Sequence, residues 1–234
     1  MTASQTAIEL GKQMSPLKFL LVACGLTLAM TPVYAHGSAQ HASTSASASA
    51  KATASVAAPK LQAAMRDLWH AHVVNTREYA FAVKAGDSKR IARAENAVVA
   101  NAKQLAGAVG SFYGKAAGDR MLTLIAGHWG AIKTMTDASH VQDKAASAKA
   151  MSALMGNANE IAVFLSGANP NLPVDAVRGL LVAHGAHHAA QINQVMTGDL
   201  KGEQATWTAM QAHMDVIADA LAGAIAKQFP DKAS

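Results

Sequence analysis

The residues best suited to chemistry in this sequence are histidines that recur at a fixed interval. His72, His128 and His184 lie 56 residues apart, and a leucine stands four residues before each of them. A neutral imidazole is a common ligand of zinc, copper and nickel. Three imidazoles in equivalent places therefore suggest a site for a transition-metal ion.

Two further sets of residues keep the same 56-residue interval. The first set is Asn101, Asn157 and His213. The second set is Asp87, Asp143 and Asp199. Three sets with one interval indicate an internal triplication, which is typical of chains built from repeated helical units. We expect the repeats to cover about residues 59–114, 115–170 and 171–230.

Each of these aspartates lies midway between a repeated histidine and the polar residue that follows it. Asp87, for example, lies next to Gly86 and midway between His72 and Asn101. Partners equidistant from the turn of an antiparallel helix pair lie at one height, here about 21 Å from the turn at 1.5 Å per residue. Apolar residues three and four positions away place the polar residues on the core face. If the hairpins pack in one direction, the histidines and asparagines of both sets meet in one interior layer.

The third repeat carries additional histidines. His188 stands one helical turn after His184, and His213 takes the place that asparagine holds in the other repeats. Two histidines at i and i+4 can bind one metal ion from a single helix face. The sequence therefore predicts metal ligands at His184, His188 and His213, joined by His72 and His128 if the hairpins converge.

The interior layer has two interpretations that the sequence leaves open. In the structural interpretation, Asn101 and Asn157 hydrogen-bond to the histidines, and the layer only sets the register of the helices. In the functional interpretation, the histidines bind copper, zinc or nickel. Buried imidazoles need partners in either case, because an unpaired polar group is costly to bury.

Motifs of several enzyme classes are missing from the sequence. It has no Glu-x-x-His of carboxylate-bridged di-iron bundles, no His-Glu-x-x-His, no Cys-x-x-Cys-His and no phosphate-binding loop. The leading hypothesis is therefore non-enzymatic binding of a transition-metal ion, for buffering or delivery. The alternatives are a structural or interaction module of the cell envelope, and a metal- or haem-dependent enzyme that uses the same histidines.

The elements that must position these residues are helices. Apolar residues make up 51% of the 234-residue chain, and from Pro59 onward they recur at three- and four-residue spacing. Six helices are expected, near residues 59–84, 88–112, 115–139, 142–166, 173–197 and 200–228. The predicted fold is all-α, a six-helix bundle built from three αα-hairpins of about 56 residues within a domain of residues 57–230.

Residues 1–35 have the features of a secretory signal peptide. Basic residues precede an apolar run at 19–30, and small residues precede a cleavage site after Ala35. The protein is therefore expected in the periplasm, with membrane contact only through this segment. Translation from Met14 would give a more usual signal length. Cys24 ends a lipobox-like sequence, which offers lipidation as an alternative to this cleavage.

Residues 36–56 are mainly serine, alanine, threonine and histidine and are expected to form a disordered tail. Cleavage after Ala35 would leave His36 as the first residue, whose free amine and imidazole can together chelate copper(II). The formal net charge is +5, but the basic residues within 84–93 are not interleaved with aromatic residues. Nucleic acid is therefore not an expected partner.

Several segments resemble an uncharacterised family of small helical bacterial proteins. The segments are residues 68–77 (LWHAHVVNTR), 112–114 (FYG), 157–166 (NANEIAVFLS) and 226–230 (AKQFP). The resemblance extends over roughly residues 61–230 and implies a helical fold without implying a mechanism. The family pattern often has a glutamate-like residue at the place of His70, which argues against His70 as a ligand. The export signal is a departure from the family.

Overall fold

The structure is a computed structural model, which describes residues 58–233. The expected signal peptide, the tail with His36 and the cleavage site lie outside the described residues. The described residues form helices and no strands, which confirms the all-α prediction. Within this part of the chain, no helix combines the length and the apolar character needed to span a bilayer.

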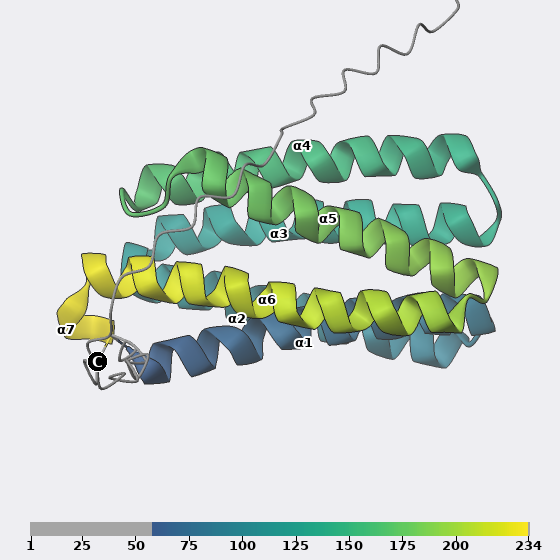
Figure 1. Cartoon of the computed structure of the whole chain (residues 1–234), viewed down its shortest axis with the longest axis horizontal. Coiled ribbons are helices and arrows are strands. Elements are labelled where there is room, and N and C mark those ends of the chain that lie inside the picture. The colour runs from purple at the N-terminus through teal and green to yellow at the C-terminus, as the bar shows by residue number, and fades with distance from the viewer. Residues whose placement is uncertain (1–57, 234) are drawn as a thin grey trace, which may run out of the picture. The chain divides into compact units, whose positions relative to one another are not determined.

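The described part of the chain folds into six long helices and one short one (Figure 1). They are α1 (Pro59–Ala85), α2 (Ser88–Tyr113), α3 (Lys115–His140), α4 (Lys144–Ala168), α5 (Val174–Thr197), α6 (Leu200–Gln228) and α7 (Pro230–Ala233). The long helices begin and end within a few residues of the predicted limits, because turn and capping residues mark their ends. The sequence did not predict α7: Pro230 ends α6 but also suits the first turn of a new helix.

The three aspartates of the 56-residue pattern begin helices α2, α4 and α6. The Asp87 carboxylate accepts hydrogen bonds from two backbone N–H groups of α2, and Asp143 and Asp199 each accept one from α4 and α6. Such side chains satisfy N–H groups that have no partner inside the helix. Glycine with a positive φ precedes Asp87 and Asp199, whereas Gln142 takes that conformation before Asp143, with φ of 60°. The repeated aspartates are therefore helix caps.

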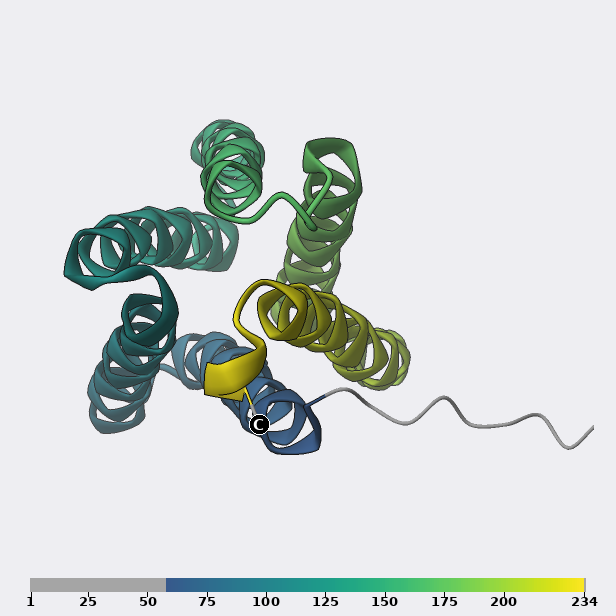
Figure 2. The ribbon, with the colours of Figure 1, turned by 90° about the vertical axis from the view of Figure 1, so that its left-hand side faces the viewer.

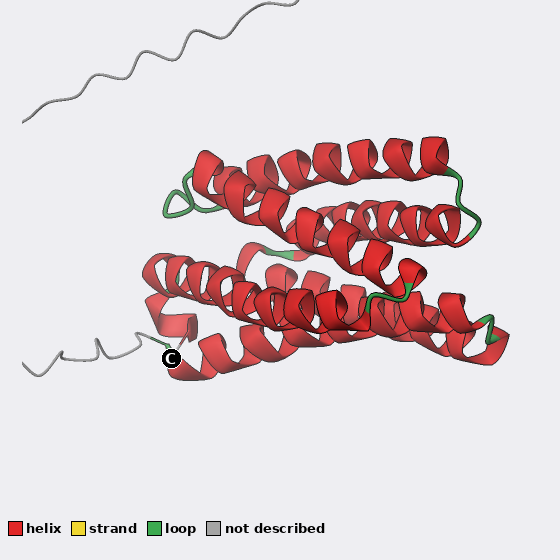
Figure 3. Ribbon diagram, turned by 45° about the vertical axis from the view of Figure 1, so that its right-hand side comes forward, coloured by secondary structure: helices red, strands yellow, loops and turns green. Residues whose placement is uncertain are grey.

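The long helices form a ring in which every second helix lies inside. Helices α1, α3 and α5 contact one another, while α2 packs against α1 and α3, α4 against α3 and α5, and α6 against α5 and α1. Figure 2, which looks along the helices, shows them placed around a common centre. The connections between successive helices are short and lie at the two ends of the bundle (Figure 3). Side chains on the inner faces of α1, α3 and α5 are therefore directed to one shared region.

Apolar side chains fill the space between the helices. Val73, Met210 and Met214 have exposed fractions of 0%, and burying a side chain of this size contributes about 1.5–3 kcal/mol. Small residues bring helices close together where they meet. A Cβ atom on Gly118 of α3 would lie 3.0 Å from the backbone oxygen of Ala106 in α2. The core around the inner helices is therefore tightly packed, which fixes the positions of the polar residues within it.

A candidate metal centre

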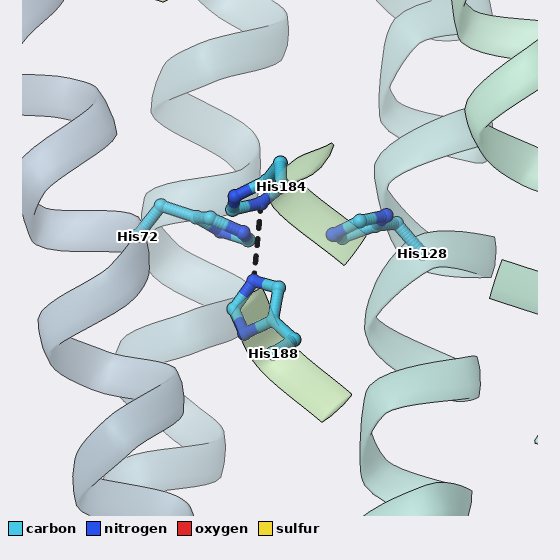
Figure 4. A group of neighbouring side chains, drawn as sticks. All are labelled: His72, His128, His184 and His188. Atoms are coloured by element: carbon cyan, nitrogen blue, oxygen red, sulfur yellow. Dashed lines mark hydrogen bonds between the residues drawn. The ribbon is translucent and has the colours of Figure 1, made fainter. Parts of the chain in front are cut away.

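Four histidines from the three inner helices meet in the core. His72 comes from α1, His128 from α3, and His184 and His188 from α5 (Figure 4). Their exposed fractions are 1–3%. One ligand nitrogen from each ring lies within 4.8 Å of those from the other three. The structure thus brings together four of the six histidines that the sequence predicted as metal ligands.

The local sequence explains why these side chains point inwards. A buried apolar residue stands three positions before each of the three repeated histidines; these residues are Trp69, Ile125 and Leu181. Residues three or four positions apart share one helix face, so the histidines lie on the same buried face as these apolar residues. His188 follows His184 by one turn and therefore points into the same region.

The four imidazole rings surround one point. The six distances between ring centroids are between 4.4 and 5.8 Å. The ring centroids therefore lie closer to the corners of a tetrahedron than to those of a square, because in a square two of the six distances would be clearly longer than the other four. With zinc–nitrogen bonds of 2.0–2.1 Å, the nitrogens of a tetrahedral site are about 3.3 Å apart. The Nε2 atoms of His184 and His188 are 3.0 Å apart, and one ligand nitrogen from each of the four rings lies within 4.8 Å of the other three.

Several ring nitrogens of the cluster have no hydrogen-bond partner among the described residues. They are Nε2 of His72, both nitrogens of His128 and Nδ1 of His184. One hydrogen bond joins members of the cluster, between the Nε2 atoms of His184 and His188 (Figure 4). A buried polar group without a partner costs about 1–3 kcal/mol. Water or a bound ion is the expected partner of such nitrogens.

Burial keeps the four rings neutral. It lowers the pKa of His72 from 6.5 to about 3 and that of His128 to about 4. The pKa values of His184 and His188 lie well below the ordinary value, first because the rings are buried and second because charges on neighbouring histidines would repel. At neutral pH each ring therefore has a free electron pair on one nitrogen, which is the state in which imidazole binds a metal ion.

The second set of repeated residues lies outside this cluster. Each member donates a hydrogen bond to the backbone oxygen of the leucine four residues before a repeated histidine. The three bonds are Asn101 to Leu68 (3.0 Å), Asn157 to Leu124 (2.9 Å) and His213 to Leu180 (2.8 Å). The prediction of a single interior layer is therefore wrong: the histidines form an inner cluster, and Asn101, Asn157 and His213 form a separate outer set. Helices α2, α4 and α6 lie outside, so their side chains at this height reach the backbone of a neighbouring helix and not the centre.

The asparagines do not form the hydrogen-bonded seam that the structural interpretation expected. Asn157 lies close enough to His128 to raise its pKa, an effect smaller than the lowering by burial, but the side-chain oxygen of Asn157 and both nitrogens of His128 have no partner within hydrogen-bond geometry among the described residues. The side-chain oxygen of Asn101 also has none. The amide groups of both asparagines are instead used to hold the neighbouring backbone. Helix register and the histidine cluster therefore depend on different side chains.

The remaining histidines lie apart from the group of four. His213 is on the outer side, beside His187, with 5.2 Å between their ring centroids. The Nε2 atom of His70 lies 2.8 Å from an aspartate oxygen of α6. His140 is exposed and ends α3. The proposed copper(II) site at His36 stays a prediction, because His36 lies outside the described residues.

One buried polar cluster was not predicted from the sequence. The Glu203 carboxylate is 2% exposed and accepts hydrogen bonds from Arg77 (2.6 and 2.8 Å) and from Gln191 (3.0 Å). The hydrogen bonds from Arg77 lower the pKa of Glu203. Arg77 precedes Glu203 by 126 residues, and no sequence pattern links the two. Neither apolar periodicity nor the 56-residue interval indicates a contact between residues this far apart in the sequence.

Comparison with protein-family models gave no match, and neither did comparison with curated proteins or with solved structures. A function for this chain has to come from the arrangement of its own residues.

Proposed function

We propose that the protein binds one transition-metal ion through His72, His128, His184 and His188, and that it buffers or delivers the ion without enzymatic activity. The observation that carries this proposal is the cluster: four buried, neutral rings surround one point, and several of their nitrogens have no partner among the described residues. An ion at that point would accept an electron pair from each ring.

A purely structural role for the histidines is less well supported. A structural polar cluster is expected to satisfy its own hydrogen-bonding groups, because each unsatisfied group destabilises the fold. Here Asn101, Asn157 and His213 each donate a hydrogen bond to the backbone of a neighbouring helix. Both nitrogens of His128, in contrast, have no partner in the described part of the chain. A bound metal ion would explain why the nitrogens of His128 have no partner in that part of the protein, whereas a role in setting the register of the helices would not.

The arrangement also favours binding over catalysis. Four protein ligands complete the coordination of a tetrahedral ion and leave no open position for a substrate, which is typical of structural and storage sites. Haem is a poor fit for the same cluster. Its flat macrocycle would need a wide gap between rings on its two faces, whereas no two ring centroids of the cluster are more than 5.8 Å apart.

The geometry narrows the choice of ion. Zinc(II) and copper(I) accept a tetrahedral set of nitrogens, whereas copper(II) and nickel(II) prefer square-planar or tetragonal sites. Four neutral imidazoles leave the charge of the ion uncompensated, and burying a charge becomes more costly as the charge increases. The neutral ligand set therefore favours copper(I) over zinc(II), and competition between these two ions tests this ranking.

The proposal includes the architecture and the location inferred from the sequence. Three αα-hairpins of about 56 residues would each contribute one ligand, and the third would add His188. The signal-like residues 1–35 would deliver the chain to the periplasm, where metal binding serves buffering or transfer. Sequencing the N-terminus of the protein recovered from periplasm tests this part. A mature chain that begins at His36 supports it, and one that retains residue 1 contradicts it.

The direct test is the metal content of the full-length protein, secreted and purified without an affinity tag. We expect close to one ion of copper or zinc for each chain. Free metal at about 100 times its dissociation constant should add about 2.7 kcal/mol to the free energy of unfolding, and this raises the melting temperature by roughly 5–10 °C. His128→Leu should remove the bound ion and this shift.

Two control variants locate the site. His213→Asn should retain the ion, because His213 lies outside the cluster. His36→Ala should also retain it, and loss of the ion in this variant would move the site to the N-terminus of the mature chain. A wild-type protein without metal, whose melting temperature stays constant on addition of zinc or copper, would contradict the proposal.

A further inference from the structure

The third hairpin differs from the other two by three histidines that lie close together. At the places of His187, His188 and His213, the second hairpin has Ala131, Ile132 and Asn157, and the first has Asn75, Thr76 and Asn101. His188 provides the fourth ring of the inner cluster. The other two extra histidines stand outside that cluster and have no role in it. Their presence on the one hairpin that completes the cluster needs a separate explanation.

His187 and His213 form a pair at the seam between α5 and α6. Their ring centroids are 5.2 Å apart, which is within the range of 4.4–5.8 Å found inside the inner cluster. Both residues are partly exposed, whereas the inner rings are buried. Two imidazoles at this spacing can bind one ion between them. The pair is therefore a second, more accessible place for the same kind of ion.

Each ring of the pair has a nitrogen that makes no hydrogen bond in the described part of the chain and could bind a metal ion. Nε2 of His213 hydrogen-bonds to the backbone oxygen of Leu180. A carbonyl oxygen only accepts, so this nitrogen carries a proton, and in the neutral ring the free electron pair is on Nδ1. Nδ1 of His187 is buried without a hydrogen-bond partner among the described residues.

The pair lies next to the inner cluster. His187 directly precedes His188 in the chain. The backbone oxygen of Leu180, which is hydrogen-bonded to His213, lies one helical turn before His184 on α5, so both outer rings meet α5 within one turn of an inner histidine. An ion held by the pair would thus be near its final ligands. Solvent has no comparable access to the inner rings, whose exposed fractions are 1–3%.

We propose that His187 and His213 are a loading site, through which the metal ion passes between solvent and the inner four-histidine cluster. This inference rests on the proposed metal-binding function. The two outer nitrogens replace two water molecules of the arriving ion. Nitrogens of His184 and His188 then replace the outer nitrogens one at a time, and His72 and His128 complete the site. The ion keeps its charge throughout, and each exchange breaks one metal–nitrogen bond as another forms.

The chain itself supplies the variant that tests this inference. His187→Ala combined with His213→Asn converts the outer residues of the third hairpin into those of the second, Ala131 and Asn157. The new asparagine can donate to the Leu180 oxygen, as Asn157 donates to Leu124 at 2.9 Å. The fold and the inner cluster are therefore retained. Any change in metal exchange can then be assigned to the two missing imidazoles.

The experiment measures the rates at which the full-length protein takes up zinc(II) or copper(I) and loses it to a chromophoric chelator. Fluorescence of Trp69, whose ring lies 5.9 Å from that of His72, offers a second signal for uptake. We expect the double variant to bind one ion with unchanged equilibrium affinity, while uptake and release both become at least ten times slower. Equal slowing in both directions leaves the dissociation constant unchanged. His140→Ala removes an exposed histidine at the end of α3 and should leave both rates unchanged.

Three results would overturn the loading role. Unchanged rates in the double variant would show that the ion takes another route. A weaker equilibrium affinity would place His187 or His213 in the final site. Equal slowing in His140→Ala would show that any surface histidine assists capture. A wild-type protein that binds no ion is a different result, because it contradicts the metal-binding function itself.

Discussion

Two buried polar clusters lie along the inner helices, and they differ in how completely the protein satisfies them. The Glu203 carboxylate receives three hydrogen bonds, two from Arg77 and one from Gln191. The histidine cluster has one internal hydrogen bond, and four of its buried nitrogens have no partner among the described residues. The same fold thus completes one polar cluster with its own side chains and leaves the other incomplete.

This difference is the one expected between a structural cluster and the proposed binding site. A buried charge is tolerated when a partner and additional hydrogen bonds surround it, as for Glu203. Neutral rings without partners lower stability and have no structural benefit of their own. Proteins often accept reduced stability at functional sites. The histidine cluster has these features, and substitutions in the two clusters test the difference between them.

The largest expected effect is acid unfolding of the metal-free protein. In the folded state His72 and His128 stay neutral down to pKa values of about 3 and about 4, whereas in the unfolded chain they protonate near 6.5. The unfolded state therefore binds more protons below pH 6.5, and the free energy of unfolding falls as the pH falls, by up to about 1.4 kcal/mol per pH unit for each ring. We expect the helical circular dichroism signal to be lost between about pH 6 and pH 4.

Metal should protect the protein in this range, because a bound ion adds to the free energy of unfolding. The midpoint of acid unfolding should move to lower pH when the metal is present. In the His128→Leu variant the pH dependence should be less steep, since one buried titrating ring is gone. A constant free energy of unfolding between pH 7 and pH 4 would show that the rings are not held neutral.

The next largest effect is expected from breaking the complete cluster. Arg77→Ala leaves the buried Glu203 carboxylate without its charged partner, and we expect a loss of about 3–5 kcal/mol in the free energy of unfolding. Chemical denaturation measures this loss. Metal stoichiometry, measured at low temperature where the variant is folded, should stay at that of the wild type. If Arg77→Ala removed the metal without lowering the free energy of unfolding, the Glu203 cluster would serve metal binding and not stability, which contradicts the roles assigned to the two clusters.

An opposite effect is expected at the histidine cluster. His128→Leu replaces a ring with two unpartnered nitrogens by an apolar side chain of similar size. Since no hydrogen bond is lost, the metal-free protein should gain about 1–3 kcal/mol in the free energy of unfolding. Denaturant titrations in the presence of a chelator measure this gain. A clear loss of stability would show that His128 contributes to the fold through contacts other than a bound ion.

The sequence predicted the helices and the four inner histidines because both depend on local spacing. Helix limits follow from apolar periodicity and from residues such as Asp87 and Asp199, which cap the helices after them. The inward direction of His72, His128 and His184 follows from their buried neighbours one turn away. Such features are repeated in the sequence, so no knowledge of how the helices cross is needed to find them.

The parts that depend on helix packing could not be predicted in this way. Equal height along a hairpin placed His213 near the level of His184, but height does not determine which side of the helix faces the centre. In the structure α6 lies outside, so His213 reaches the Leu180 backbone and the cluster is completed by His188. Glu203 and its partner Arg77 are also brought together only by packing of α6 against α1.

The smallest effect is expected at His213, where the outer set can be compared between hairpins. His213→Asn should change the free energy of unfolding of the metal-free protein by less than about 0.5 kcal/mol, because the amide can donate to Leu180 as Asn101 does to Leu68. His213→Ala removes the hydrogen bond to the Leu180 oxygen and should lower the free energy of unfolding by about 1 kcal/mol. Denaturant titrations of the two variants in parallel provide the comparison. Equal losses in both variants would mean that the ring of His213, and not its bond to the backbone, stabilises the α5–α6 seam, and the hairpins would then not be equivalent at this position.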